Sequence, residues 1–222
     1  MKKILTGLVL SSSLLFAGNY LTVSTQQSET KFSDQSFYQG SYDTQQYVIE
    51  LYAIGDDFIF KGGYAYLPSQ TSSFTGGSSR DNYDYERDAM AVGFDFIYKL
   101  NLEGNFFVGP MVSVVYSFMV NEKAKNITKG TTTTYQSDSS GSSIPLGFMA
   151  GFDYMDDSFA YITYELDSDI KDSDDHDDKE IGVGLTHSFG SFLFDVAYTY
   201  ESNTLDTIDS DTSIRFGVGV QF

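Results

Sequence analysis

The strongest constraint on the fold is an alternation of apolar side chains with small or polar ones, which recurs along most of the chain. At the C-terminus, Ile214, Phe216 and Val218 are separated by single Arg and Gly residues, and the pattern continues to Phe222. Successive side chains of a β-strand point to opposite faces, so a period of two predicts strands with one apolar face. Nine segments carry this pattern: 46–54, 58–66, 90–98, 108–120, 144–154, 160–166, 180–186, 192–201 and 213–222.

The residues between the apolar positions indicate where these strands lie. They are rich in Gly, Ala and Ser, usually with a single charge, whereas the solvent face of a soluble β-sandwich carries Lys, Glu and Thr throughout. Small residues and isolated charges suit the crowded interior of a narrow barrel, while Phe, Tyr, Val and Ile suit lipid. The pattern therefore predicts an all-β fold, a transmembrane antiparallel up-and-down β-barrel, with a soluble sandwich as the alternative.

The links between the segments alternate in length, as expected for a membrane barrel with short turns on one side and long loops on the other. The short links are 55–57, 101–104, 156–158 and 190–191, and the long ones are 67–87, 120–142, 169–179 and 203–211. Single-chain bacterial barrels have an even number of strands. Adding Tyr20–Thr25, which also alternates and precedes a long link over 26–45, predicts ten strands. Eight strands is the alternative, with the N-terminal region as an extension or an inserted plug.

The first 17 residues differ from the rest of the chain. They contain two lysines, an apolar stretch interrupted by serines, and a small residue before Gly18. This order predicts a cleaved signal peptide over 1–17, which leaves 18–222 as the barrel domain. An uncleaved anchor is the alternative, although the apolar stretch is short for a membrane-spanning helix.

Composition excludes several other classes of protein. The chain has no Cys, so it has neither a disulfide framework nor a thiolate metal site, and only His176 and His187 offer imidazole groups. Its 31 acidic and 13 basic residues give a formal charge of −18. Because phosphate neutralisation requires clustered Lys and Arg, we expect no nucleic-acid partner.

With a leader ending at Ala17 and an alternating C-terminal strand, the chain resembles the small bacterial outer-membrane β-barrel superfamily, the porin-like and OmpA/OmpX-like transmembrane barrels. The resemblance implies a place in the bacterial outer membrane, in contact with its lipid and lipopolysaccharide. It implies no particular activity and leaves the oligomeric state open. A terminal aromatic residue preceded by apolar residues at every second position looks like the signal read by the barrel assembly machinery, here Ile214, Phe216, Val218, Val220 and Phe222.

Charged residues on the small-residue face are expected to lie in the lumen. An isolated buried charge is costly, so each cation there should have a carboxylate partner. The excess of acids allows two interpretations, a static network that stiffens the lumen or the lining of a narrow, cation-preferring pore. The residues concerned are Glu50, Lys61, Asp95, Lys99, Asp153, Glu165, Asp195, Glu201 and Arg215.

The segment 167–178 reads DSDIKDSDDHDD and concentrates carboxylates in one long link. Hard divalent cations prefer carboxylate oxygens, so loosely bound Ca²⁺ or Mg²⁺ is one expectation and a merely solvated acidic loop is the other. The spacing lacks the Gly and the distal Glu of an EF-hand loop. No other cofactor is expected, and the candidate ligands are Asp172, Asp174, Asp175, Asp177 and Asp178.

Two activities compete with a structural or porin-like role. Asp174 and His176 have the Asp-x-His spacing of omptin proteases, but the acidic pair that this family also needs has only the poorly spaced candidates Asp81 and Asp84. His187 precedes a Ser, yet neighbours in a strand point to opposite faces and cannot act directly as base and nucleophile. We therefore expect no enzyme, with an omptin-type surface protease or an adhesin-like surface-binding barrel as alternatives.

Overall fold

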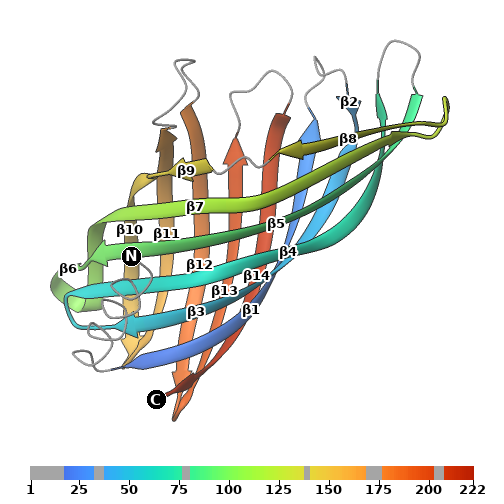
Figure 1. Cartoon of the computed structure of the whole chain (residues 1–222). Coiled ribbons are helices and arrows are strands. Elements are labelled where there is room, and N and C mark those ends of the chain that lie inside the picture. Colours follow the sequence, from blue (N-terminus) through green and yellow to red (C-terminus); the bar gives the residue numbers. More distant parts are fainter. Residues whose placement is uncertain (1–17, 33–37, 77–80, 138–140, 169–176, 203–207) are drawn as a thin grey trace.

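Ten long antiparallel strands form one closed barrel (Figure 1). The computed structural model describes residues 18–32, 38–76, 81–137, 141–168, 177–202 and 208–222. The barrel strands are β1 (Asn19–Phe32), β3 (Ser41–Ile54), β4 (Phe58–Gly76), β5 (Asp81–Tyr98), β7 (Phe106–Asn126), β10 (Leu146–Met155), β11 (Ser158–Ser168), β12 (Asp177–Phe189), β13 (Phe192–Ser202) and β14 (Ile208–Gln221). Shorter elements are β2 (Tyr38–Gln39), β6 (Leu100–Asn101), the 3-10 helix η1 (Glu103–Asn105), β8 (Thr131–Ser137) and β9 (Gly141–Ser143).

The barrel closes because the first strand pairs with the last. β1 pairs with β14 from Tyr20 opposite Gln221 onward, and it pairs with β3 on its other side. β7 and β10 complete the ring. An open sheet would leave backbone donors and acceptors without partners in lipid, so closure is what permits membrane crossing. The ten-strand prediction is confirmed, and the eight-strand alternative is wrong because the N-terminal segment supplies a full barrel strand.

Side chains alternate between the outside and the inside of the barrel. Phe148 on β10 is 62% exposed, whereas the next residue, Met149, is 1% exposed. On β14, Val218 is exposed between two buried glycines. The predicted apolar outer face is confirmed by this alternation. Among the described residues, no helix is long and apolar enough to span a bilayer.

The two ends of the barrel differ in their connections. Short turns join β3 to β4, β10 to β11 and β12 to β13, and all of them lie at the same end (Figure 1). The first and last described strands also meet there, where the Phe222 amide donates to the Asn19 carbonyl at 3.2 Å. We call this the turn end and the opposite one the loop end.

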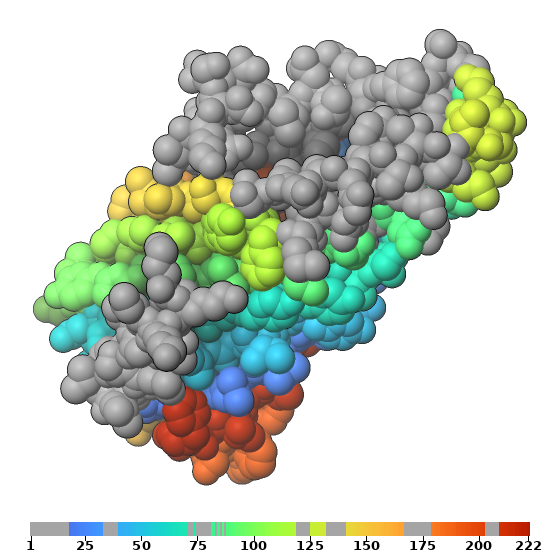
Figure 2. Space-filling model, in the orientation of Figure 1, coloured from blue at the N-terminus to red at the C-terminus, as the bar shows by residue number. Residues whose placement is uncertain are grey.

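At the loop end, the strands run farther than the apolar alternation. β4 continues to Gly76 and β5 begins at Asp81, so most of the predicted link 67–87 is strand. β7 reaches Asn126 and turns back into β8 within the predicted link 120–142. Much of these two predicted loops is strand, because polar residues can keep the backbone paired without an apolar face. The tip of the β7–β8 hairpin projects from the body of the molecule, in yellow-green in Figure 2.

Polar contacts hold this strand extension, which comprises β8 and the loop-end halves of β4, β5 and β7. Asp81 is buried, and its Oδ2 accepts from Asn126 Nδ2 at 2.9 Å and lies 2.6 Å from Lys129 Nζ. Asp84 on β5 stands directly opposite Lys125 on β7. Opposite charges on facing residues favour this register over its alternatives. The extension is therefore stabilised by pairing and charge rather than by an apolar core.

Candidate functional site: the barrel lumen

Large apolar side chains fill the lumen at the turn end. They come from different strands, and each is at most 1% exposed. We call them the packed layer, which consists of Tyr20, Tyr52, Ile59, Ile97, Phe107, Met149, Phe159 and Leu193. The prediction of a lumen lined by small residues is wrong at this end, because the inward positions there hold aromatic and branched side chains.

Glycines make room for large rings in the packed layer and beside it. A Cβ atom on Gly151 would collide with the ring of Phe107, and one on Gly184 would collide with the ring of Tyr161. Phe107 meets Phe159 edge to face, with ring centroids 5.9 Å apart, an arrangement that aromatic pairs prefer. Along one row of paired residues, large and small side chains alternate as Phe107, Gly151, Tyr161 and Gly184. The small residues thus accommodate large rings from neighbouring strands.

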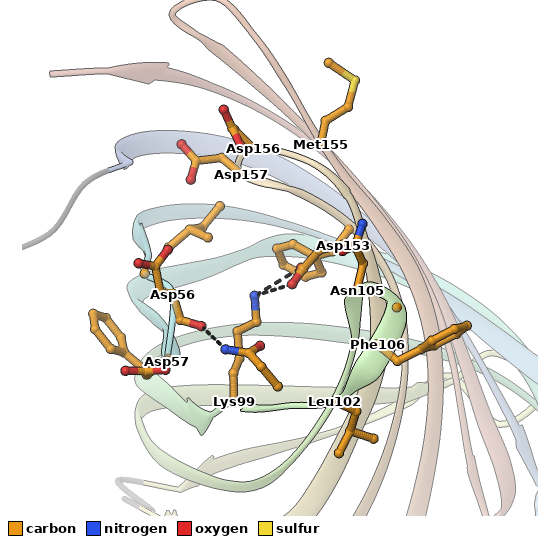
Figure 3. Close-up of a pocket in the computed structure, with 16 residues that line it drawn as sticks. Asp56, Asp57, Lys99, Leu102, Asn105, Phe106, Asp153, Met155, Asp156 and Asp157 are labelled. Carbon is orange, nitrogen blue, oxygen red and sulfur yellow. Dashed lines mark hydrogen bonds and ion pairs between the residues drawn. The ribbon is translucent and has the colours of Figure 1, made fainter.

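Lys99 borders the packed layer on the turn-end side (Figure 3). Its Nζ donates to both carboxylate oxygens of Asp153, at 3.0 and 2.8 Å, and lies 4.7 Å from the centroid of the Phe107 ring. The Lys99 amide donates to the Asp57 carbonyl at 2.7 Å, which fixes it to the β3–β4 turn. A buried ammonium requires such a partner, and the ring face adds a cation–π contact.

Beyond Lys99, a pocket of about 710 Å³ opens at the turn end. Asp56 and Asp57 of one turn and Asp156 and Asp157 of another line it (Figure 3). The hydroxyl of Tyr20 donates to Asp157 Oδ2 at 2.9 Å, so the packed layer is tied to the β10–β11 turn. The pocket is therefore an acidic mouth whose inner limit is the packed layer.

Within the lumen, Arg215 bridges two acids. Its Nη2 lies 2.8 Å from Asp195 Oδ2, and its Nη1 lies 3.5 Å from Glu50 Oε1. Asp195 also accepts from the Thr186 hydroxyl at 2.9 Å, and Thr186 contacts the Tyr52 hydroxyl at 3.2 Å. A planar guanidinium can address two carboxylates at once, which suits Arg to this place. The network connects β14, β13, β12 and β3 across the lumen.

Lys61 is also buried, but it has a different environment. Its side chain is 5% exposed, and its Nζ lies 4.8 Å from the centroid of the Tyr52 ring and 5.3 Å from that of Tyr161. Within the described part of the chain, it makes no hydrogen bond or ion pair. Asp95 stands opposite Lys61 in the pairing of β4 with β5, but no described carboxylate lies within ion-pair distance of its Nζ, and the ammonium is held between two aromatic rings.

Two adjoining cavities lie between the packed layer and the loop end. The deep cavity has about 160 Å³ and is lined by Lys61 and Arg215, and the outer cavity has about 290 Å³. Gln26 and Thr199 line both of them. Four acids on neighbouring strands stand side by side along these cavities, an acid row formed by Glu165, Glu180, Glu201 and Asp211.

The structure places four of the nine predicted lumen residues along the two adjoining cavities and the other five in two ion-pair groups. Lys61, Asp95 and Glu165 line the deep cavity, and Glu201 lines the outer one. The remaining five form the ion pairs of Lys99 with Asp153 and of Arg215 with Asp195 and Glu50.

Sequence reasoning missed two members of the acid row. Glu180 precedes the outward Ile181, so the same alternation places it inside. Asp211 lies just before the alternating C-terminal segment and had no such signal, because β14 begins earlier than its apolar pattern. Its place is set by pairing with Thr30 of β1.

The predicted metal ligands belong to the acidic link 167–178. Asp172, Asp174 and Asp175 lie outside the described residues, as do the side chains of Asp177 and Asp178. Within the described part, no group of three His, Asp or Glu side chains is arranged to hold a metal ion.

The five residues of the predicted assembly signal share one outward face. Each is at least 39% exposed, in an otherwise well-packed strand that pairs with β1 and β13. They are Ile214, Phe216, Val218, Val220 and Phe222.

Comparison with solved structures identifies the architecture. The transport unit of the autotransporter AIDA-I from Escherichia coli matches over 98% of this chain and 97% of its own, with a TM-score of 0.54 at 14% identity. The chain has the fold of a bacterial outer-membrane β-barrel. The β domain of the Bordetella autotransporter BrkA matches over 93% of this chain and 100% of its own, with a TM-score of 0.56 at 14% identity.

The translocator domain of the autotransporter NalP from Neisseria meningitidis is similar as well, over 100% of this chain and 96% of its own, with a TM-score of 0.53 at 13% identity. No family model and no curated protein sequence matches the chain. Identity of this size establishes a shared fold, and the activity must be argued from the lumen itself.

Proposed function

We propose that this protein is an integral barrel of the bacterial outer membrane with a structural, surface-displaying role and a lumen that does not conduct. The observation that carries the proposal is the packed layer, whose side chains are at most 1% exposed. The pocket at the turn end and the deep cavity share no lining residue. A pore needs a wetted path along its whole length, and an apolar constriction excludes water.

The outer face supports the membrane location. Phe148, Ile162 and Val218 are exposed on the outside of three different strands, where lipid would cover them. In this proposal the turn end faces the periplasm, the loop end meets lipopolysaccharide, and residues 1–17, outside the described part, are removed as a signal peptide. The outward residues of β14 would be read by the barrel assembly machinery.

Conductance in planar bilayers tests the proposal. The purified wild-type barrel is expected to give no stepwise current. The double variant Phe107→Ala, Phe159→Ala should give current steps, because water can then enter the packed layer. Phe106→Ala is the matched control, since Phe106 is the outward neighbour of Phe107 and is 55% exposed. Like the wild type, this control should stay silent.

Stepwise, cation-selective current through the wild-type protein would overturn the closed-lumen proposal. It would favour the narrow cation-preferring pore, which the acid row supports, because carboxylate rings select cations. The two roles therefore give opposite results in a single recording.

Surface binding is the second candidate role, and the strand extension favours it. Beyond the barrel, β8 pairs only with β7 among the described strands, so the hairpin presents an edge at the loop end. Exposed edges are places where other chains can add a strand. Deleting 127–130 together with β8 should abolish adhesion to a surface that the wild-type protein binds, without changing barrel assembly.

Two further proposals concern the acidic segment 167–178. If it binds Ca²⁺ or Mg²⁺ loosely, calcium should raise the melting temperature, and changing Asp174 and Asp175 to Asn should remove the rise. An equal rise in that variant would reject the site.

We also infer that the protein is not an enzyme. Peptide cleavage that is lost in His176→Ala would support the omptin-type alternative instead.

A further inference from the structure

Two residues of opposite formal charge, Lys61 and Glu180, line the deep cavity, and neither makes a hydrogen bond or an ion pair within the described residues. Lys61 is buried, and although Asp95 stands opposite it in the strand pairing, no described carboxylate lies within ion-pair distance of its Nζ. A buried charge without a direct partner is costly, so this site favours a group supplied from outside the chain.

The positive pole is well defined. Lys61 Nζ is held over the rings of Tyr52 and Tyr161, which fix its position without accepting its hydrogen bonds. Arg215 lines the same cavity, and its buried Nε has no acceptor among the described residues. These unused donors require an anionic or carboxylate acceptor.

The negative pole lies on β11, β12 and β13. Glu180 stands directly between Glu165 on β11 and Glu201 on β13, so its nearest neighbours along the row are like charges. Like charges side by side destabilise one another, and a cation placed among them relieves this repulsion. The row therefore favours a positive group, and Glu180 lies where the deep and outer cavities adjoin.

We propose that the deep cavity binds a small zwitterion that carries one ammonium and one carboxylate group, such as an amino acid. The carboxylate contacts Lys61 and Arg215, and the ammonium contacts Glu180 and its neighbours in the acid row. A volume of about 160 Å³ equals that of roughly five waters, which suits a molecule of this size. This inference goes beyond the proposed function, because both a closed and a conducting barrel could hold the ligand.

Access is from the loop end. The outer cavity leads to the deep cavity through polar residues such as Gln26, Thr199 and Ser213, whereas the packed layer lies on the other side. A solute that enters from outside is thus retained rather than passed on. The barrel would act as a cup for small zwitterions.

Titration calorimetry of the wild-type barrel in a non-ionic maltoside detergent tests the pairing of charges. The three probes share a four-carbon chain. γ-Aminobutyrate carries a positive and a negative charge, n-butylamine carries only the positive one, and butyrate carries only the negative one. γ-Aminobutyrate is expected to bind about tenfold or more tightly than either single-charge probe, since it makes both charge-assisted contacts. Equal affinity for butylamine, or no heat with any probe, would overturn the proposal.

Two variants assign the poles. Lys61→Met should remove the preference for γ-aminobutyrate over butylamine, and Glu180→Gln should remove its preference over butyrate. Lys31→Met and Glu29→Gln are the controls, because these residues lie at the loop end of β1, are exposed and line neither cavity. Heat-modifiable migration on a gel checks folding; if Lys61→Met fails to fold, the probe series and Glu180→Gln still decide. Unchanged preferences in the folded variants would contradict the assignment.

Discussion

The two ends of the lumen share one backbone architecture but are filled in opposite ways. At the turn end, Phe107 packs against Phe159 and Gly151, and almost none of the surface of Phe107, Phe159 and Tyr52 is exposed. Toward the loop end, hydroxyls, amides and the acid row line open cavities instead. The outward face is apolar around the packed layer and the deep cavity, but it becomes polar beside the outer cavity, where Gln27, Asp43 and Gln45 are exposed. The inward residues therefore decide whether the membrane-facing part of the barrel is a core or a polar cup.

Arg215 joins the two regions, so its loss should have the largest effect. Arg215→Met leaves Asp195 and Glu50 buried without the cation between them. Removing one partner of a buried ion pair costs about 3–5 kcal/mol. We expect the free energy of unfolding in urea, measured in lipid vesicles, to fall by that amount.

Arg215→Lys is the control for this prediction, since it keeps the charge but not the forked geometry. It should lose less stability than Arg215→Met. Equal stability of Arg215→Met and the wild type would show that the network does not connect the two ends energetically.

A larger side chain at a turn-end glycine should have a smaller effect. Gly151→Val would force the Phe107 ring out of its place, and overpacking of a filled core costs about 1–3 kcal/mol. The matched change at the loop end is Gly141→Val, where nothing lies within 4 Å of the added Cβ atom. Urea unfolding of both variants should separate them, and equal losses would break the distinction between a packed and an open end.

The smallest effect is expected in the strand extension. Asp81→Asn weakens the contact with Lys129, whose side chain is largely exposed, so the global stability should change by less than about 1 kcal/mol. Local opening of the β7–β8 hairpin tip should increase more, because the hydrogen bond from the Ile127 amide to the Asn82 carbonyl lies at this tip. Hydrogen exchange of the Ile127 amide should accelerate, while amides of the packed layer keep their rates. Acceleration throughout the barrel would show that the extension and the core unfold together.

Much of this architecture could be predicted from the sequence, because an apolar stripe with a period of two stands opposite a stripe of small residues and isolated charges, which the solvent face of a soluble sandwich does not carry. This alternation predicted the strands around Phe148 and Val218 and the short turns between strands. It did not locate strand ends at the loop end, since β4 and β7 continue past the bilayer on polar residues such as Thr75 and Lys125. Lipid dictates the apolar pattern, but backbone pairing does not stop where lipid stops.

The lumen was predicted less completely, for a different reason. The alternation places Lys61 and Glu180 inside, yet it cannot say which inward residues meet across the barrel. Arg215 meets Asp195 and Glu50 from strands on either side, a relation fixed by register and not by sequence spacing. The packed layer was missed because its members are single large residues on separate strands, such as Ile59 and Phe107, without a local signature.

Closure of the ring by β1 and β14 also bears on how the chain acquires its structure. Tyr20 and Gln221 face each other although almost the whole polypeptide separates them. Contacts between such distant positions form slowly, because a long loop must be ordered first. One edge of β1 therefore has no partner until β14 is in place, and the addition of β14 is the event that closes the ring.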